Sequence, residues 1–202
     1  MGREIELKIP LTKSKYDEVL NNFYLSEKSY PEITIIDQNP VKIIKTDRYF
    51  SRYDTLEERR EHNEPQVIRI RTDAEENGSS KSYFTIKTKK YENGIEINKE
   101  DETFLDNPEA LCIFFEEAGY HHWFTKEKSA YSCHCSLSDS PDLVFHVELV
   151  EVNKHPYIEI EVTSESQTPD QISRELDNFV KKMGLNPEDK DPRSWYTICQ
   201  SE

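Results

Sequence analysis

The sequence has no long apolar run and no excess of positive charge. No stretch of the 202 residues approaches the roughly 20 apolar residues that span a membrane. The first residues alternate polar with apolar, so they lack the apolar core of a signal peptide. Acidic residues outnumber basic ones by 40 to 26, whereas nucleic-acid-binding proteins carry basic faces. We therefore expect a cytoplasmic protein that binds neither membranes nor nucleic acids.

The four cysteines do not have the spacing of a disulfide framework. Cys133 and Cys135 flank His134, but no second pair of ligands lies at zinc-site spacing. We interpret all four cysteines as reduced thiols. The chain also lacks internal repeats and low-complexity tracts, and its length suits a single domain over residues 1–202.

The sequence does contain a series of strand-like segments with helices between them. Alternation of apolar and polar residues predicts strands over residues 3–9, 44–51, 66–72, 82–89, 95–104, 123–131, 143–151 and 157–163. Helical spacing and capping residues predict helices over residues 12–23, 108–119 and 169–183, and a short one from Pro192. Asn93-Gly94 indicates a hairpin turn. Residues 26–40 are expected to be irregular, and residues 52–65 to form a charged loop.

The polar faces of these strands carry grouped charge of one sign. The basic pairs are Arg69 with Arg71, Lys87 with Lys89 and Lys126 with Lys128; the acidic groups are Glu4 with Glu6, Glu96 with Glu100 and Glu102, and Glu159 with Glu161. One explanation is a set of solvated outer faces. The other is a closed barrel of about eight strands whose charged face points inward, with helices covering the apolar outer face.

A charged interior is costly unless its ions pair or bind a ligand. Grouped carboxylates favour a divalent cation such as Mg²⁺ or Mn²⁺. Grouped lysine and arginine side chains favour a polyanion, because arginine grips phosphate through two donors and lysine supplies a point charge. The two kinds of group together describe a site for a metal-bound polyphosphate.

The motif Glu4-Ile5-Glu6-Leu7-Lys8 resembles the N-terminal Glu-x-Glu-x-Lys signature of the CYTH superfamily, the triphosphate tunnel metalloenzymes. This family includes class IV adenylyl cyclases, thiamine triphosphatases and inorganic tripolyphosphatases. Further similar segments follow in the family's order, at residues 47–50, 68–71, 85–87, 99–102, 126–128, 157–161, 184–185 and 194–196. The sequence departs from the pattern at Asn98 and Lys128, which stand where arginine is usual. Residues 153–156 lack the glycine that usually precedes the last Glu-x-Glu.

The resemblance implies an α+β fold, in which a closed antiparallel eight-stranded β-barrel has helices packed on its outside. It also implies a division of labour among the inward side chains. The expected ligands of Mg²⁺ or Mn²⁺ are Glu4, Glu6, Glu100, Glu148, Glu159 and Glu161. The residues expected to hold the triphosphate are Lys8, Arg69, Arg71, Lys87, Lys126 and Lys128. The expected catalytic residues are Lys8, Glu6 and Glu161.

The expected activity is hydrolysis of inorganic tripolyphosphate, a nucleoside triphosphate or thiamine triphosphate. One alternative is a class IV-type adenylyl cyclase that converts ATP to cyclic AMP and pyrophosphate, because no purine pocket is legible in the sequence. Another is a non-catalytic sensor of polyphosphate or nucleotide, against which the full set of acidic residues argues. Either a monomer or a homodimer is compatible with the sequence.

Overall fold

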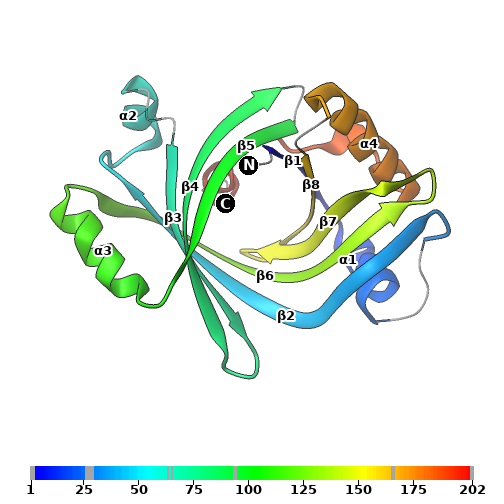
Figure 1. Cartoon of the computed structure of the whole chain (residues 1–202), viewed down its shortest axis with the longest axis horizontal. Coiled ribbons are helices and arrows are strands. Elements are labelled where there is room, and N and C mark those ends of the chain that lie inside the picture. The colour runs from blue at the N-terminus through cyan, green and yellow to red at the C-terminus, as the bar shows by residue number, and fades with distance from the viewer. Residues whose placement is uncertain are drawn as a thin grey trace.

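In the computed structural model, eight antiparallel strands close into a barrel (Figure 1). The structure describes residues 3–25, 30–62, 64, 66–92, 95–164 and 167–200. The strands are β1 (Arg3–Pro10), β2 (Ile33–Ser51), β3 (Gln66–Glu75), β4 (Ser80–Glu92), β5 (Ile95–Leu105), β6 (His121–Leu137), β7 (Ser140–Val152) and β8 (His155–Ser164). Their order around the barrel is β1-β5-β4-β3-β2-β6-β7-β8. The predicted α+β barrel is confirmed.

The apolar face of the barrel points outward and is covered by helices α1 (Lys13–Leu20) and α4 (Pro169–Lys182). Ile5, Leu7 and Ile9 alternate along β1 and lie in one buried cluster with Val19 of α1 and Leu176 of α4. Because successive side chains of a strand point to opposite faces, the residues between them point into the barrel. The strand alternation is therefore inverted relative to a sheet that exposes its polar face to water.

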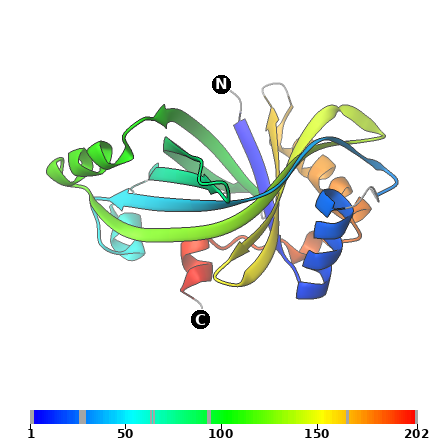
Figure 2. The same ribbon diagram turned by 90° about the horizontal axis from the view of Figure 1, so that it is seen from below.

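Three further α-helices lie around the barrel in the described part of the chain: α2 (Leu56–Glu61), α3 (Pro108–Glu117) and α5 (Trp195–Cys199). Helix α3 begins after Asn107, whose side chain accepts a hydrogen bond from the backbone of Ala110. Its Phe115 packs in a second buried cluster with Phe50 and Ile70. Figure 2 shows α5 at the end of the barrel opposite the N-terminus. No helix among the described residues is long and apolar enough to cross a membrane.

Two expectations for irregular segments were wrong. Residues 33–40 belong to β2, which continues past Pro40 because the β2–β6 ladder skips a register between Asn39 and Ile43, where a missing N–H does no harm. The segment expected to be a charged loop contains α2, because Thr55 and Glu58 form a capping box at its start. The predicted Asn93-Gly94 turn lies outside the described residues.

The turn between β7 and β8 holds two non-glycine residues in the left-handed region. Asn153 has φ of 48° and Lys154 has φ of 66°, and Val152 pairs with His155 on either side. Positive φ at both central positions is the requirement of a two-residue hairpin turn of type I′. Asparagine tolerates this conformation, whereas lysine is strained in it. Lys154 therefore holds a strained conformation in this turn, where the family pattern led us to expect a glycine.

Replacing Lys154 with glycine should therefore stabilise the protein by about 0.5–1 kcal/mol, since glycine adopts positive φ without a Cβ clash. Urea unfolding would measure this gain. Lys154→Ala is the matched control, because it shortens the side chain but keeps the clash. Equal stability of the glycine and alanine variants would show that the turn is not strained.

Candidate active site

The charged inner face of the barrel lines a cavity of about 260 Å³. All of the site residues predicted from the sequence line this cavity except Lys8. Lys8 is buried next to it, with its Nζ 5.8 Å from the centre of the Trp195 ring. The cavity also receives residues that the sequence analysis did not assign to the site, among them Lys45, Tyr49, His146 and Trp195.

Three carboxylates from the two neighbouring strands β1 and β8 form an acidic trio. Ligand oxygens of Glu4, Glu6 and Glu161 lie within 4.8 Å of one another. Glu6 and Glu161 face each other directly across the β1–β8 ladder. Burial, together with the neighbouring carboxylates, raises the pKa of Glu4 to about 7 and that of Glu161 to about 8. A divalent cation fits this donor set, since it would relieve the repulsion among three oxygen ligands.

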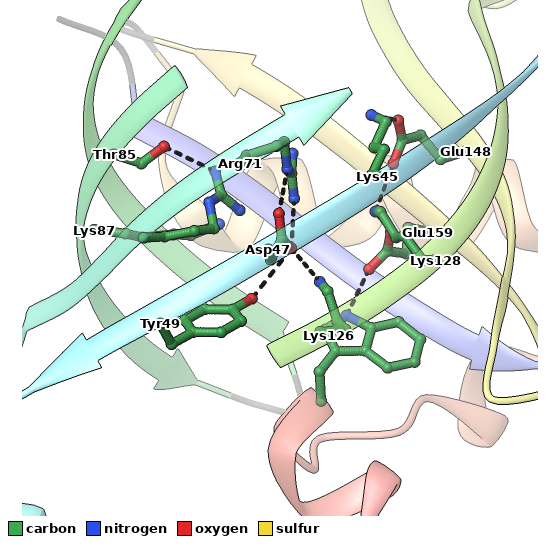
Figure 3. A network of polar contacts seen from close by, with 12 residues as sticks. Lys45, Asp47, Tyr49, Arg71, Thr85, Lys87, Lys126, Lys128, Glu148 and Glu159 are labelled. Carbon is green, nitrogen blue, oxygen red and sulfur yellow. Dashed lines mark hydrogen bonds and ion pairs between the residues drawn. The ribbon is translucent and has the colours of Figure 1, made fainter. Parts of the chain in front are cut away.

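On the opposite side of the ring, Asp47 of β2 holds two cationic side chains (Figure 3). Arg71 donates two hydrogen bonds to its carboxylate, at 2.6 and 3.0 Å, and Lys126 Nζ lies 2.9 Å from Oδ2. Burial would raise the pKa of Asp47, but Arg71 and Lys126 hold it well below its ordinary value. Asp47 is therefore a fixed negative charge that orients donors toward the cavity.

A second group of ion pairs surrounds Lys128. Its Nζ lies 2.7 Å from Glu148 and 2.5 Å from Glu159, and Lys45 also contacts Glu148. Burial opposes ionisation of Glu159, but Lys128 and Lys126 lower its pKa to about 2. Trp195 adds a hydrogen bond of 2.8 Å from Nε1 to Glu159. Two carboxylates that the sequence suggested as metal ligands are thus held by lysines.

A third group joins the acidic trio to the basic wall. Lys87 Nζ lies 3.3 Å from oxygens of both Glu6 and Glu100. Arg69 donates hydrogen bonds to Glu100 at 2.9 Å and to Thr85 at 3.1 Å. Burial opposes the charge on Lys87, but the surrounding carboxylates raise its pKa above its ordinary value. Lys87 therefore lies between the acidic trio and the cationic side chains of the cavity.

Asn98 is one of the two positions at which the family pattern led us to expect arginine. It pairs with Glu4 across the β1–β5 ladder and with Lys89 across the β4–β5 ladder. Its side chain is buried, and neither amide atom has a hydrogen-bond partner among the described residues. A buried amide without partners destabilises the free protein.

Comparisons with known proteins agree with this architecture. The CYTH domain model matches residues 2–195. Among solved structures, a conserved hypothetical protein from Pyrococcus furiosus is 23% identical, with a TM-score of 0.67 over 96% of this chain and 99% of that one. A putative adenylate cyclase from Vibrio parahaemolyticus is 16% identical, with a TM-score of 0.65 over 98% of both chains.

A putative adenylyl cyclase from Hippeastrum, described as having a dominant triphosphatase activity, is 17% identical, with a TM-score of 0.60. That match covers 100% of this chain and 96% of the Hippeastrum chain. No curated protein matches the sequence. Because the domain model spans nearly the whole length, the protein belongs to the CYTH family.

Proposed function

We propose that the protein is a metal-dependent triphosphatase whose substrate lies inside the barrel, and that residues 1–202 form one tunnel domain. The observation that carries the proposal is the presence of an acidic trio and a cationic wall in one cavity of about 260 Å³. Membership of the CYTH family supports an enzyme that acts on triphosphates. The Hippeastrum relative's described triphosphatase activity supports hydrolysis over other outcomes.

Glu4, Glu6 and Glu161 would hold Mg²⁺ or Mn²⁺, which would neutralise charge on phosphate oxygens and lower the pKa of a bound water. The sequence suggested six metal ligands, and the proposal keeps these three of them. Glu100, Glu148 and Glu159 instead orient Arg69, Lys87 and Lys128 through the ion pairs described above.

The cationic side chains would bind the triphosphate oxygens. Phosphoryl transfer depends mainly on positioning and on stabilisation of charge in the transition state. Arg71 and Lys126 are fixed by Asp47, so they are preorganised for phosphate. The other donors in this role are Lys8, Arg69, Lys87 and Lys128. We assign the catalytic role to Lys8, Glu6 and Glu161. Glu6 and Glu161 would hold the metal ion, and Lys8, two residues after Glu6 on β1, would contact the phosphate beside it.

A product assay tests the proposal. The pure protein is incubated with Mg²⁺ or Mn²⁺ and, separately, with ATP, inorganic tripolyphosphate and thiamine triphosphate. Orthophosphate without cyclic AMP is the expected result. Cyclic AMP with pyrophosphate would instead assign the cyclase reaction, which the description of the Vibrio relative makes the second candidate. Binding of a triphosphate without formation of any product would indicate a non-catalytic sensor.

Metal binding should release protons near neutral pH. In the metal-free protein, Glu4 and Glu161 have pKa values of about 7 and 8, so both carry protons at pH 6. Since a metal ligand must be deprotonated, the apparent affinity for Mn²⁺ should rise about tenfold per pH unit for each proton displaced between pH 5 and 7. Calorimetry in buffers of different ionisation enthalpy measures the proton count. An affinity that does not change over this range would remove both residues from the metal site.

A further inference from the structure

The side chain of Asn98 is buried on the inner face of the barrel, beside the acidic trio. Asn98 is 1% exposed, and its neighbour Ile97 packs against the outer apolar cluster. Because successive side chains of a strand point to opposite faces, the amide of Asn98 points inward. Strands β5 and β8 flank β1 in the barrel (Figure 1). Asn98 and Glu161 therefore lie on opposite sides of the two β1 carboxylates of the trio.

Neither atom of this amide has a hydrogen-bond partner among the described residues, although charged groups surround it. Glu4 lies directly opposite Asn98 on β1, and the Cβ atoms of residues paired in this way are about 4.5–5.5 Å apart. The other charged neighbours are engaged elsewhere. Lys89, opposite on β4, contacts Glu96 at 2.6 Å, and Glu100 pairs with cations of β3 and β4. Buried amide atoms are nearly always paired in folded proteins, so an unpaired amide in such surroundings points to a role in binding.

The chemistry of the amide narrows what it can bind. Its Oδ1 accepts hydrogen bonds and its Nδ2 donates them. A bare cation would engage only the oxygen, and a phosphate would engage only the nitrogen. A hydrated cation beside Glu4 engages both, because a metal-bound water can donate to Oδ1 while Nδ2 donates to the carboxylate. Mg²⁺ usually keeps several waters when carboxylates hold it, so such a water is expected at this site.

We propose that Asn98 is a positioning residue of the metal centre. Its Oδ1 accepts a hydrogen bond from a water on the divalent cation of the acidic trio, and its Nδ2 donates to the carboxylate of Glu4. The inference rests on the proposed function, because it adds a residue around the same cation. Partners of this kind orient the ligands of a metal ion, and their loss commonly weakens metal binding by about 10–100-fold.

Leucine at this position separates a positioning role from a purely structural one. Asn98→Leu keeps the branching of the side chain and removes the two unpaired polar atoms, so the Tm of the metal-free protein should stay equal or rise. Its dissociation constant for Mn²⁺, measured by calorimetry at neutral pH without any triphosphate, should nevertheless increase at least about tenfold. A residue that only supported the fold would lose Tm and affinity together.

Asn98→Asp is the conservative variant. Its carboxylate can still accept a hydrogen bond from a metal-bound water, and it adds negative charge beside the cation. The dissociation constant of this variant for Mn²⁺ should therefore be equal to or below the wild-type value. Thr103→Ala, an exposed and uncharged change on the outer face of β5, is the matched control and should leave the constant unchanged.

Wild-type affinity for Mn²⁺ in Asn98→Leu would overturn the inference, and so would an equal loss of affinity in the leucine and aspartate variants. In either case, hydrolysis of a triphosphate by the wild-type protein in the product assay would leave the proposed function intact. A wild-type protein that binds no Mn²⁺ and hydrolyses no triphosphate would overturn both.

Discussion

Replacing Glu161 with glutamine should lower turnover about 100-fold or more while the barrel stays folded. Glu161 faces Glu6 across the β1–β8 ladder and belongs to the acidic trio. An amide keeps the shape of the side chain but removes the charge that would hold a divalent cation. Initial rates at saturating Mn²⁺ and triphosphate measure the loss. Full activity of this variant would remove Glu161 from the site.

The same substitution should raise the stability of the metal-free protein at alkaline pH. Burial raises the pKa of Glu161 to about 8 from its ordinary value of 4.5. The wild-type protein therefore loses stability as pH rises from about 4.5 through 8, because the folded state holds the proton longer than the unfolded state does. Glutamine has no proton to lose, so its advantage in Tm should appear at pH 9 and vanish at pH 4. Glu127→Gln, on the exposed face of β6, is the control and should show neither effect.

Replacing Asp47 with asparagine should lower the free energy of unfolding by about 3–5 kcal/mol. Asp47 is fully buried and is the shared partner of Arg71 and Lys126, so its loss leaves two buried cations without their counter-charge. Urea unfolding at neutral pH measures the effect. Asp101→Asn, an exposed change on β5, is the control and should be nearly neutral.

A polyanion should restore part of the stability that Asp47→Asn removes. Tripolyphosphate carries the negative charge that Arg71 and Lys126 would lack, so it should raise the Tm of the variant more than that of the wild type. In the wild type, the ionised Asp47 stabilises the folded state at pH values above about 4. This contribution to the free energy of unfolding should be lost progressively as pH falls below about 4, because the pKa of Asp47 is lower in the folded than in the unfolded state. A smaller Tm increase in the variant would show that these two cations do not hold phosphate.

The alternation of polar and apolar residues made the barrel predictable from the sequence. Segments without a clear alternation could not be predicted in this way. Neighbours such as Glu4 and Ile5 show that one face of each strand is charged and the other apolar. The resemblance to the CYTH family indicated that the charged face points inward. Lys45 lies two residues before Asp47 along β2, so the same alternation places its side chain in the barrel. Residues 33–40 were predicted to be irregular because they contain a proline and lack a clear alternation. In the structure they belong to β2, whose pairing with β6 tolerates register shifts.

The partners of the inward carboxylates could not be predicted. Glu148 and Glu161 both alternate into the barrel, yet Glu148 lies with Lys45 and Lys128, whereas Glu161 lies with other carboxylates. The difference depends on contacts across the closed ring, which no single strand reveals. A second cavity, which Tyr49, Phe124 and Tyr196 line, could not be predicted either. These rings come from β2, β6 and α5, which lie far apart in the chain.

Closure of the barrel joins the beginning of the described chain to its later part. β1 pairs with β8 from Arg3 opposite Ser164 onward, and with β5 on its other edge. Such pairing over a long sequence separation is slow, because the loop entropy is lost before the contacts form. During synthesis β1 must wait for β8, so the acidic trio, which draws on both strands, is complete only after β8 has paired with β1. Under the proposed function, the rate at which the refolding protein gains affinity for a divalent cation would therefore report the pairing of β1 with β8, separately from the formation of the helices.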